Sequence, residues 1–279
     1  MCGILYKSQF MLISSASVGG KMKITVLAEN TALNNSFGCE HGLSFYIELN
    51  NNTKILFDMG QSDLFIKNAL KLVIDLSKVD FAIVSHGHYD HGGGLNCFLK
   101  INPTANVYIR KEAFGEFYNA SGKYIGLDKS LSDCNRLIFC KDELEIAKGI
   151  KLCSQNNAVR LHKTETCGLS VRSAQTLTDD TFEHEQYLFL EDGKKRVVIS
   201  GCSHKGILNI IDWFKPDVVV GGFHFSKLTS NELDKNIEKL KELKTVFYTC
   251  HCTGVEQYRY IKTKMENVKY ISAGESFTI

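Results

Sequence analysis

The sequence predicts an α/β fold built as one layered domain. Short apolar runs bounded by Gly, Asn and Asp are typical of strands, and they alternate with segments of helical periodicity in both halves of the chain. No linker, low-complexity tract or short repeat divides the sequence. The 279 residues are 44% hydrophobic and 23% charged, which is an ordinary globular composition with enough apolar residues for a sizeable core.

The first half of the chain is expected to alternate strands with helices. Residues 63–72 show helical periodicity behind a Ser-Asp capping signal, and residues 81–84 form the continuous apolar run of a buried strand. A second helix is expected to begin at Leu95. The expected strands of this half are residues 24–28, 43–49, 54–57, 81–84 and 106–110.

The middle of the chain is harder to assign. Residues 111–180 have weak periodicity and much Gly, Ser, Asn and Lys, so loops and a hairpin layer that shape a substrate mouth are expected there. Regular alternation then returns. The expected strands are residues 186–190, 196–200, 217–220 and 245–249, the expected helices are residues 206–214, 231–243 and 255–265, and two short strands follow.

Residues 1–21 differ from the rest of the chain. They hold a short apolar stretch and almost no positive charge near the start, which is a poor match to a secretory signal. A strand-like segment begins at Met22. We therefore expect a poorly ordered N-terminal extension, followed by a single domain over residues 22–279.

Charge and cysteine content narrow the class of protein. Lys plus Arg number 33 and Asp plus Glu number 31, and this nearly neutral balance disfavours a nucleic-acid partner. No segment approaches the ~20 apolar residues of a membrane helix, so no membrane association is expected. Ten scattered cysteines in a chain of this size favour reduced thiols and a cytoplasmic protein. The expected partner is a small-molecule substrate, and the oligomeric state is left open.

Most of the histidines share one structural setting. Six of the nine follow directly after expected strands. In α/β sheets, ligands bind at the carboxyl ends of strands, and six histidines in this position are hard to explain as ordinary loop residues. These histidines are His86, His88, His91, His204, His224 and His251.

The strongest motif is His86-x-His88-x-Asp90-His91. Alternation in an extended turn lets His86 and His88 face one metal ion, whereas Asp90 and His91 turn toward a second position. Gly87 permits the tight backbone that this arrangement needs. Imidazoles with one carboxylate suit Zn, Fe or Mn, and the ligand types alone do not choose among them. We expect two divalent ions, with zinc first and iron or manganese as alternatives.

This motif resembles the H-x-H-x-D-H signature of the metallo-β-lactamase superfamily, as does the order of elements from residue 22 onward. The resemblance implies a four-layer αββα sandwich and a metal-dependent hydrolase. It also implies that Asp58 orients the metal loop and that His251 completes the second metal site. Six stretches resemble a subfamily of class II metal-dependent hydrolases, some of them described as 7,8-dihydropterin-6-methyl-4-(ribofuranosyl)aminobenzene-5′-phosphate synthases. These stretches are residues 40–44, 57–62, 85–91, 201–206, 221–224 and 251–254.

The sequence departs from that family at two positions. Many members have a separate third histidine for the first metal ion and a later aspartate that bridges both ions. Here Cys202 falls where that aspartate is expected, and neither His162 nor His184 has the glycine-flanked setting of a third histidine. We therefore expect His204 to be a ligand in place of one of these residues. Cys202 is expected either to coordinate as a thiolate or to pack behind the site.

Three further features have two interpretations each. His224 follows two glycines, so it is expected to contact a substrate oxyanion or phosphate, or to form a hydrogen bond behind the ligands. His41 precedes a strand near the presumed mouth and is expected either to contact substrate or to form a structural turn. Cys202 is a further candidate for substrate contact. Residues 183–186 are interpreted as a solvated entrance to a strand rather than a substrate edge.

The expected chemistry follows from the metal ions. A bound divalent ion lowers the pKa of water from about 15.7 to about 7, which favours hydrolysis of an ester, lactone or phosphoester. Asp90 is expected to orient the nucleophile or shuttle a proton while binding the second ion, and Asp58 to hold a histidine in its tautomer. The alternatives are a dihydropterin or phosphoribosyl-arylamine transferase of methanopterin-type cofactor synthesis, and a metal-bound ligand sensor without turnover.

Overall fold

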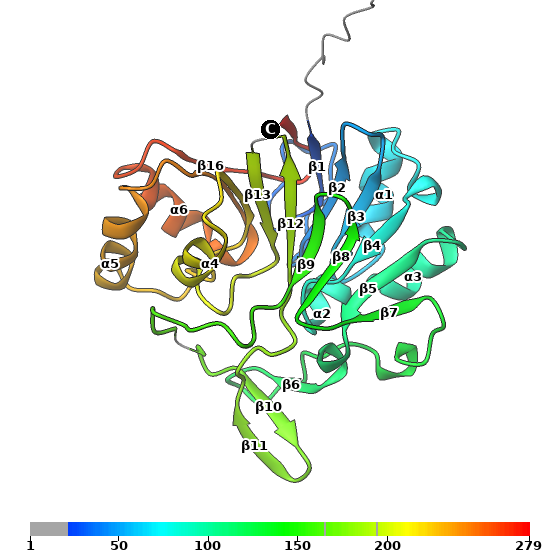
Figure 1. Ribbon diagram of the computed structural model, residues 1–279, viewed down its shortest axis with the longest axis horizontal. Helices are drawn as coiled ribbons and strands as arrows, with labels where there is room; N and C mark the ends of the chain where they lie inside the picture. Colours follow the sequence, from blue (N-terminus) through cyan, green and yellow to red (C-terminus); the bar gives the residue numbers. More distant parts are fainter. Residues whose placement is uncertain (1–21, 165, 194) are drawn as a thin grey trace, which may run out of the picture.

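The computed structural model describes residues 22–279 apart from Glu165 and Lys194, so the expectation for residues 1–21 lies outside the described residues. Two seven-stranded sheets stack face to face, with helices covering the outer face of each (Figure 1). The expected four-layer αββα arrangement is confirmed. None of the helices in the described part is long and apolar enough to cross a lipid bilayer.

The first sheet has the strand order β17-β1-β2-β3-β4-β5-β7. Its β17, β1, β2 and β3 pair in antiparallel fashion, and β3, β4, β5 and β7 run parallel. Its strands are β1 (Lys23–Ala28), β2 (Ser44–Glu48), β3 (Lys54–Phe57), β4 (Phe81–Ile83), β5 (Asn106–Arg110), β7 (Leu137–Cys140) and β17 (Ser276–Thr278), and the helices along this half are α1 (Leu64–Lys71), α2 (Tyr89–Gly92) and α3 (Leu95–Ile101).

The second sheet has the strand order β16-β15-β14-β13-β12-β9-β8. Here β13, β14, β15 and β16 run parallel, while β12, β9 and β8 are antiparallel to their neighbours. Its strands are β8 (Glu143–Ala147), β9 (Ile150–Cys153), β12 (Tyr187–Asp192), β13 (Lys195–Ser200), β14 (Val218–Gly221), β15 (Val246–Thr249) and β16 (Val268–Tyr270), and its helices are α4 (Ile207–Phe214), α5 (Ser230–Leu240) and α6 (Val255–Lys262).

The central strands are apolar throughout because both of their faces are covered. Along β14, Val218 and Val220 pack in the core between the sheets, and Val219 packs against the helices on the outer face. Side chains of a strand point to opposite faces in turn, so a strand buried on both sides needs an unbroken apolar run. This is why the continuous runs predicted strands at nearly the observed positions.

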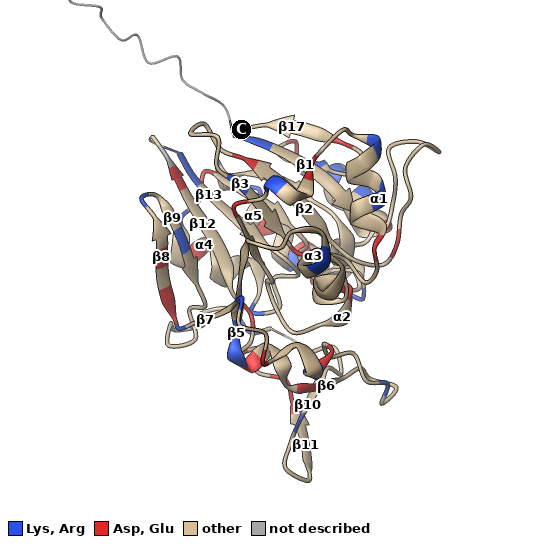
Figure 2. Cartoon of the chain, turned by 90° about the vertical axis from the view of Figure 1, so that its right-hand side faces the viewer, with Lys and Arg blue, Asp and Glu red and all other residues tan. Residues whose placement is uncertain are grey.

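The middle of the chain contributes more strands than the sequence analysis expected. Within residues 111–180, β7 joins the first sheet, and β8 and β9 form the edge of the second. The remaining strands of this segment are β6 (Glu116–Tyr118), β10 (Ser170–Ser173) and β11 (Thr176–Asp179), which form a small sheet. Elsewhere and in this segment, the described residues include 3₁₀ turns at Leu76–Lys78, Lys111–Phe114, Lys129–Leu131 and His251–Thr253. The β10–β11 hairpin projects from the body of the molecule (Figure 2). β8 was missed because it is a half-exposed edge strand with charged residues at alternate positions.

Candidate metal centre

The candidate side chains lie in loops that follow strands of both sheets. Parallel strands bring their carboxyl ends to one edge, so these loops meet although they are distant in sequence. Ligand atoms of the candidate residues form overlapping groups in which all atoms lie within 4.8 Å of one another. Three of these groups are His86 with Cys202 and His204, His91 with Cys202 and His251, and His41 with Asp90 and His251.

A hydrogen-bonded chain sets the protons on two of the imidazoles. The buried Asp58 carboxylate accepts hydrogen bonds from the Ser85 backbone N–H, the Ser85 hydroxyl and His91 Nδ1, each 2.7 Å long. Because the Ser85 hydroxyl donates to Asp58, it accepts from His86 Nδ1 at 2.8 Å. Both Nδ1 atoms therefore carry the proton, and the Nε2 atoms of His86 and His91 are left with lone pairs.

His86, His88 and His204 lie side by side, with ring centroids 4.6 Å apart for His86 and His88 and 5.0 Å apart for His88 and His204. His204 Nε2 lies 3.3 Å from His86 Nε2. Neither His88 Nε2 nor His204 Nδ1 has a hydrogen-bond partner among the described residues, although both atoms are buried. Burial lowers the pKa of all three imidazoles, to about 3 for His88, so they are neutral at physiological pH. Neutral imidazole is the form that binds a metal ion.

The donor atoms of His91, His251 and Asp90 lie close together in the second part of the candidate centre. His251 Nδ1 donates to Asn30 Oδ1 at 2.8 Å, so its Nε2 also carries a lone pair. That Nε2 lies 3.2 Å from His91 Nε2 and 3.2 Å from Asp90 Oδ2. Two lone pairs and a carboxylate oxygen at this separation repel one another unless a proton or metal ion lies among them. The donor set therefore fits a divalent metal ion.

Charges within this second part are balanced by their neighbours. Burial opposes the charged form of His91, but the carboxylates of Asp58 and Asp90 outweigh it and raise the pKa of the imidazole. A proton and a metal ion would therefore compete for the lone pair of His91 Nε2. Burial also opposes ionisation of Asp90, yet His91, His251 and His41 hold the pKa of this carboxyl well below its usual range. Asp90 is therefore an ionised carboxylate, the form that can bind a cation.

Cys202 lies between the two parts of the centre. Its Sγ is 3.2 Å from His91 Nε2, and its sulfur belongs to two of the ligand groups described above. Burial raises the pKa of this thiol. The preceding Gly201 lets the loop approach Ser85 closely, because a Cβ at residue 201 would overlap the Ser85 hydroxyl. The sulfur therefore faces the centre rather than only packing behind it.

His184, which the sequence analysis set aside, lies beside the centre and is buried. Its Nδ1 accepts a hydrogen bond from the Gly87 N–H, and its Nε2 donates to Asp180 Oδ2, both at 2.9 Å. Its ring nitrogens are thus engaged in holding the backbone between His86 and His88. The interpretation of residues 183–186 as a solvated strand entrance is wrong for His184, Glu185 and Gln186, all of which are buried.

Two buried carboxylates that the sequence analysis missed hold the ligand loops. Glu29 accepts a hydrogen bond from the His251 backbone N–H at 2.6 Å. Glu185 accepts from the backbone N–H groups of His204 at 2.7 Å and Lys205 at 3.0 Å. Glu29 directly follows β1, so the strand-end position that marked the histidines was a signal that could have found it.

Several of the site residues adopt a left-handed backbone conformation. Such φ values are uncommon for residues other than glycine, and they persist where surrounding structure enforces them. Each of these residues lies in a loop that follows a strand, where the chain must turn sharply. They are Asp58 with φ 58°, Ser203 with φ 58°, His224 with φ 56° and His251 with φ 50°.

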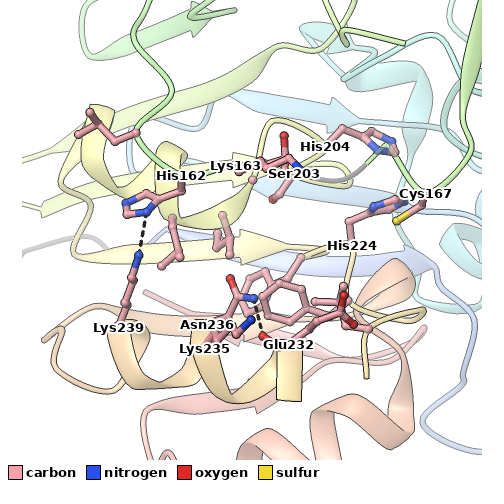
Figure 3. Close-up of a pocket in the computed structure, with 18 of the residues that line it drawn as sticks. His162, Lys163, Cys167, Ser203, His204, His224, Glu232, Lys235, Asn236 and Lys239 are labelled. Atoms are coloured by element: carbon pink, nitrogen blue, oxygen red, sulfur yellow. Dashed lines mark hydrogen bonds between the residues drawn. The ribbon is translucent and has the colours of Figure 1, made fainter. Parts of the chain in front are cut away.

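A cavity of about 730 Å³ opens beside the centre. His204 and His224, whose ring centroids are 4.4 Å apart, line it together (Figure 3). Burial lowers the pKa of His224 to about 4, so its imidazole is neutral and can either donate or accept a hydrogen bond. The side chain of His41 is 56% exposed, with Nε2 3.2 Å from Asp90 Oδ2. The size of the cavity is that of a small-molecule site.

Comparisons with known proteins agree with this geometry. A solved structure of a metal-dependent hydrolase of the β-lactamase superfamily is 34% identical, spans 92% of this chain and 99% of its own, and gives a TM-score of 0.79. An uncharacterised protein of Methanocaldococcus jannaschii is 29% identical and spans 90% of this chain and 98% of its own. The 7,8-dihydropterin-6-methyl-4-(β-D-ribofuranosyl)-aminobenzene-5′-phosphate synthase of the same organism is 28% identical and spans 91% and 95%. The family model of the metallo-β-lactamase superfamily matches residues 37–251, and the chain belongs to that superfamily.

Proposed function

We propose that this protein is a metal-dependent hydrolase that cleaves an ester, lactone or phosphoester bond in a small molecule. The observation that carries the proposal is the convergence of His91 Nε2, His251 Nε2 and Asp90 Oδ2, in which the two nitrogens have lone pairs because both Nδ1 protons are donated elsewhere. Such a cluster is unfavourable without a cation and is well suited to one.

The side chains divide into two sets of ligands. His86 and His204 would hold the first ion together with His88, whose ring lies beside both of theirs. Asp90, His91 and His251 would hold the second ion, with Cys202 placed to contact either. Zinc suits this combination of imidazole, carboxylate and thiolate, and iron or manganese are alternatives. When bound, divalent ions polarise a substrate oxygen and make water acidic enough to ionise near neutral pH.

The remaining site residues act through hydrogen bonds. Asp58 keeps the Nδ1 protons of His86 and His91 in place, the first of them through the Ser85 hydroxyl. The Asp90 carboxylate, which His41 contacts at Oδ2, would orient the attacking water and accept its proton. His224 is neutral and would donate a hydrogen bond to a substrate oxygen in the cavity.

A transferase is the second candidate because one relative that spans nearly the whole chain is named as a synthase. The same centre would then activate the transferred group toward an arylamine instead of water. Product analysis separates the two, since a transferase forms its coupled product only with the acceptor present. We also propose a cytoplasmic location, supported by the nine described cysteines being free of disulfides, and cell fractionation tests it.

The test combines metal analysis with activity. Protein purified without added metal is analysed for bound elements and assayed against panels of esters, lactones and phosphoesters. We expect two equivalents of metal ion and hydrolysis of at least one class, both lost in a His86→Ala/His88→Ala variant. Lys100→Ala/Lys244→Ala is the control, because both lysines are exposed and lie outside the ligand groups and the cavity. Full activity of the His86→Ala/His88→Ala variant would contradict the proposal, as would absence of metal after reconstitution. Bound metal without hydrolysis of any substrate class would favour the sensor alternative.

A further inference from the structure

The cavity beside His204 reaches helix α5, where it becomes cationic. Lys235 and Lys239 lie one turn apart on α5 and line the cavity together with His162 (Figure 3). Ion pairs between described side chains do not include either lysine. The ammonium groups of these lysines therefore present positive charge to the cavity.

The acidic residues of the same lining have other partners. The Glu232 carboxylate accepts hydrogen bonds from the backbone N–H and the hydroxyl of Thr229 at the start of α5, at 2.8 and 2.7 Å. Glu238 forms an ion pair with Lys241 at 2.8 Å. The hydrogen bonds from Thr229, and the charge of Lys235 to a smaller extent, lower the pKa of Glu232, so this carboxylate stays charged. The lining nevertheless holds three lysines, Lys163, Lys235 and Lys239, against these two carboxylates, and its net charge is positive.

Hydrogen bonds to Asn209 and Asp212 hold the wall that carries His162. The buried Asn209 side chain accepts from the His162 backbone N–H at 2.8 Å and donates to the His162 carbonyl at 2.7 Å. His162 Nε2 donates to Asp212 Oδ2 at 2.8 Å, so Nδ1 is free to accept from Lys239 Nζ at 3.0 Å. A neutral acceptor positions the Lys239 ammonium without cancelling its charge, which prepares it for an anionic ligand.

We propose that Lys235, Lys239 and His162 form a subsite for a phosphate group at the end of the substrate away from its reacting bond. Apolar side chains line the same cavity, so the ligand has an apolar or aromatic body between its two ends. Two ammonium groups match the two charges of a phosphate monoester. The identity of the reacting end rests on the proposed hydrolase function, whereas the phosphate subsite does not. The apolar lining consists of Ile207, Leu208, Phe223, Phe225 and Leu228.

Phenyl phosphate is the probe, and isothermal titration calorimetry measures its binding to metal-loaded and EDTA-treated protein. We expect the EDTA-treated protein to bind it and Lys235→Ala/Lys239→Ala to weaken the Kd about tenfold or more. The control Lys100→Ala/Lys244→Ala removes the same charge from exposed positions outside the cavity and is expected to bind like the wild type. His162→Ala should weaken binding less, because it releases Lys239 without removing its charge.

Three outcomes would overturn the subsite. These are no binding by EDTA-treated protein, equal weakening in the two lysine variants, and binding that is unaffected by Lys235→Ala/Lys239→Ala. Benzoate binding as tightly as phenyl phosphate would replace the phosphate by a carboxylate. Phenyl phosphate bound as expected by a protein that hydrolyses none of the test bonds would support the subsite and contradict only the hydrolase proposal.

Discussion

Asp58→Asn should weaken metal binding although Asp58 is not among the proposed ligands. Asparagine tolerates the φ of 58° at this position, and its oxygen can still accept the Ser85 N–H. Its NH₂ group would face the Ser85 hydroxyl and His91 Nδ1, which both donate to the carboxylate in the wild type. His91, and His86 through Ser85, would then carry their protons on Nε2, where no lone pair is left for an ion.

The expected loss is about 10- to 100-fold in affinity for each ion, the range found when groups that orient metal ligands are changed. This corresponds to about 1.4–2.8 kcal/mol per ion, since tenfold in Kd is about 1.4 kcal/mol. Competition between the protein and a chromophoric zinc chelator measures both affinities, and circular dichroism verifies the fold. Asp212→Asn is the matched control, because Asp212 also accepts a hydrogen bond from a histidine but lies outside the ligand groups. Wild-type affinities in Asp58→Asn would refute the reasoning.

Three other predictions address the same network and the fold around it. Ser85→Ala removes only the hydrogen bond that leads to His86. In the same competition assay, the affinity for one metal ion should fall and the affinity for the other should remain near that of the wild type. Equal loss of both affinities would contradict this prediction. Burial raises the pKa of Cys140 and Cys153 to about 12, so these thiols stay protonated at neutral pH and should resist iodoacetamide in the native protein. Exposed Cys39 should be alkylated under the same conditions. Mass spectrometry of the peptides measures the labelling, and rapid labelling of all three cysteines would contradict this prediction. Thr229→Ala removes the N-cap of α5 and should lower the free energy of unfolding in urea by about 1 kcal/mol, with Thr229→Ser close to wild type; an unchanged Thr229→Ala would show that the cap is not stabilising.

Much of the fold was predictable because its central strands are buried on both faces. Runs such as residues 81–84 and 217–220 have no competing interpretation of similar length, and the structure places β4 and β14 there. β8 was not predicted because this edge strand alternates apolar with charged residues. β9, which pairs with β8 and β12, was not predicted because part of its stabilisation comes from these neighbours. Pairing between strands leaves no pattern among neighbouring residues in the sequence, so a short segment read alone does not predict it.

The candidate site was only partly predictable for a related reason. The strand-end position marked His86, His88, His91, His204, His224 and His251 before any contact between them was known. Glu185 and His184 gave no comparable signal, because their roles are hydrogen bonds to backbone N–H groups of distant loops. The hydrogen-bond partners of a buried side chain depend on packing rather than on neighbours in sequence.

By itself, the sequence determined the layered α/β class, the metal-loop motif and the strand ends on which the histidines lie, because these depend on residues within one turn or strand. Only the tertiary structure decided which imidazoles share an ion position. His86 and His204 are 118 positions apart, and His91 and His251 are 160 positions apart, yet their Nε2 atoms lie within 3.3 Å. Stacking of two sheets with their strand ends at one edge brings them together, and no local pattern encodes that distance.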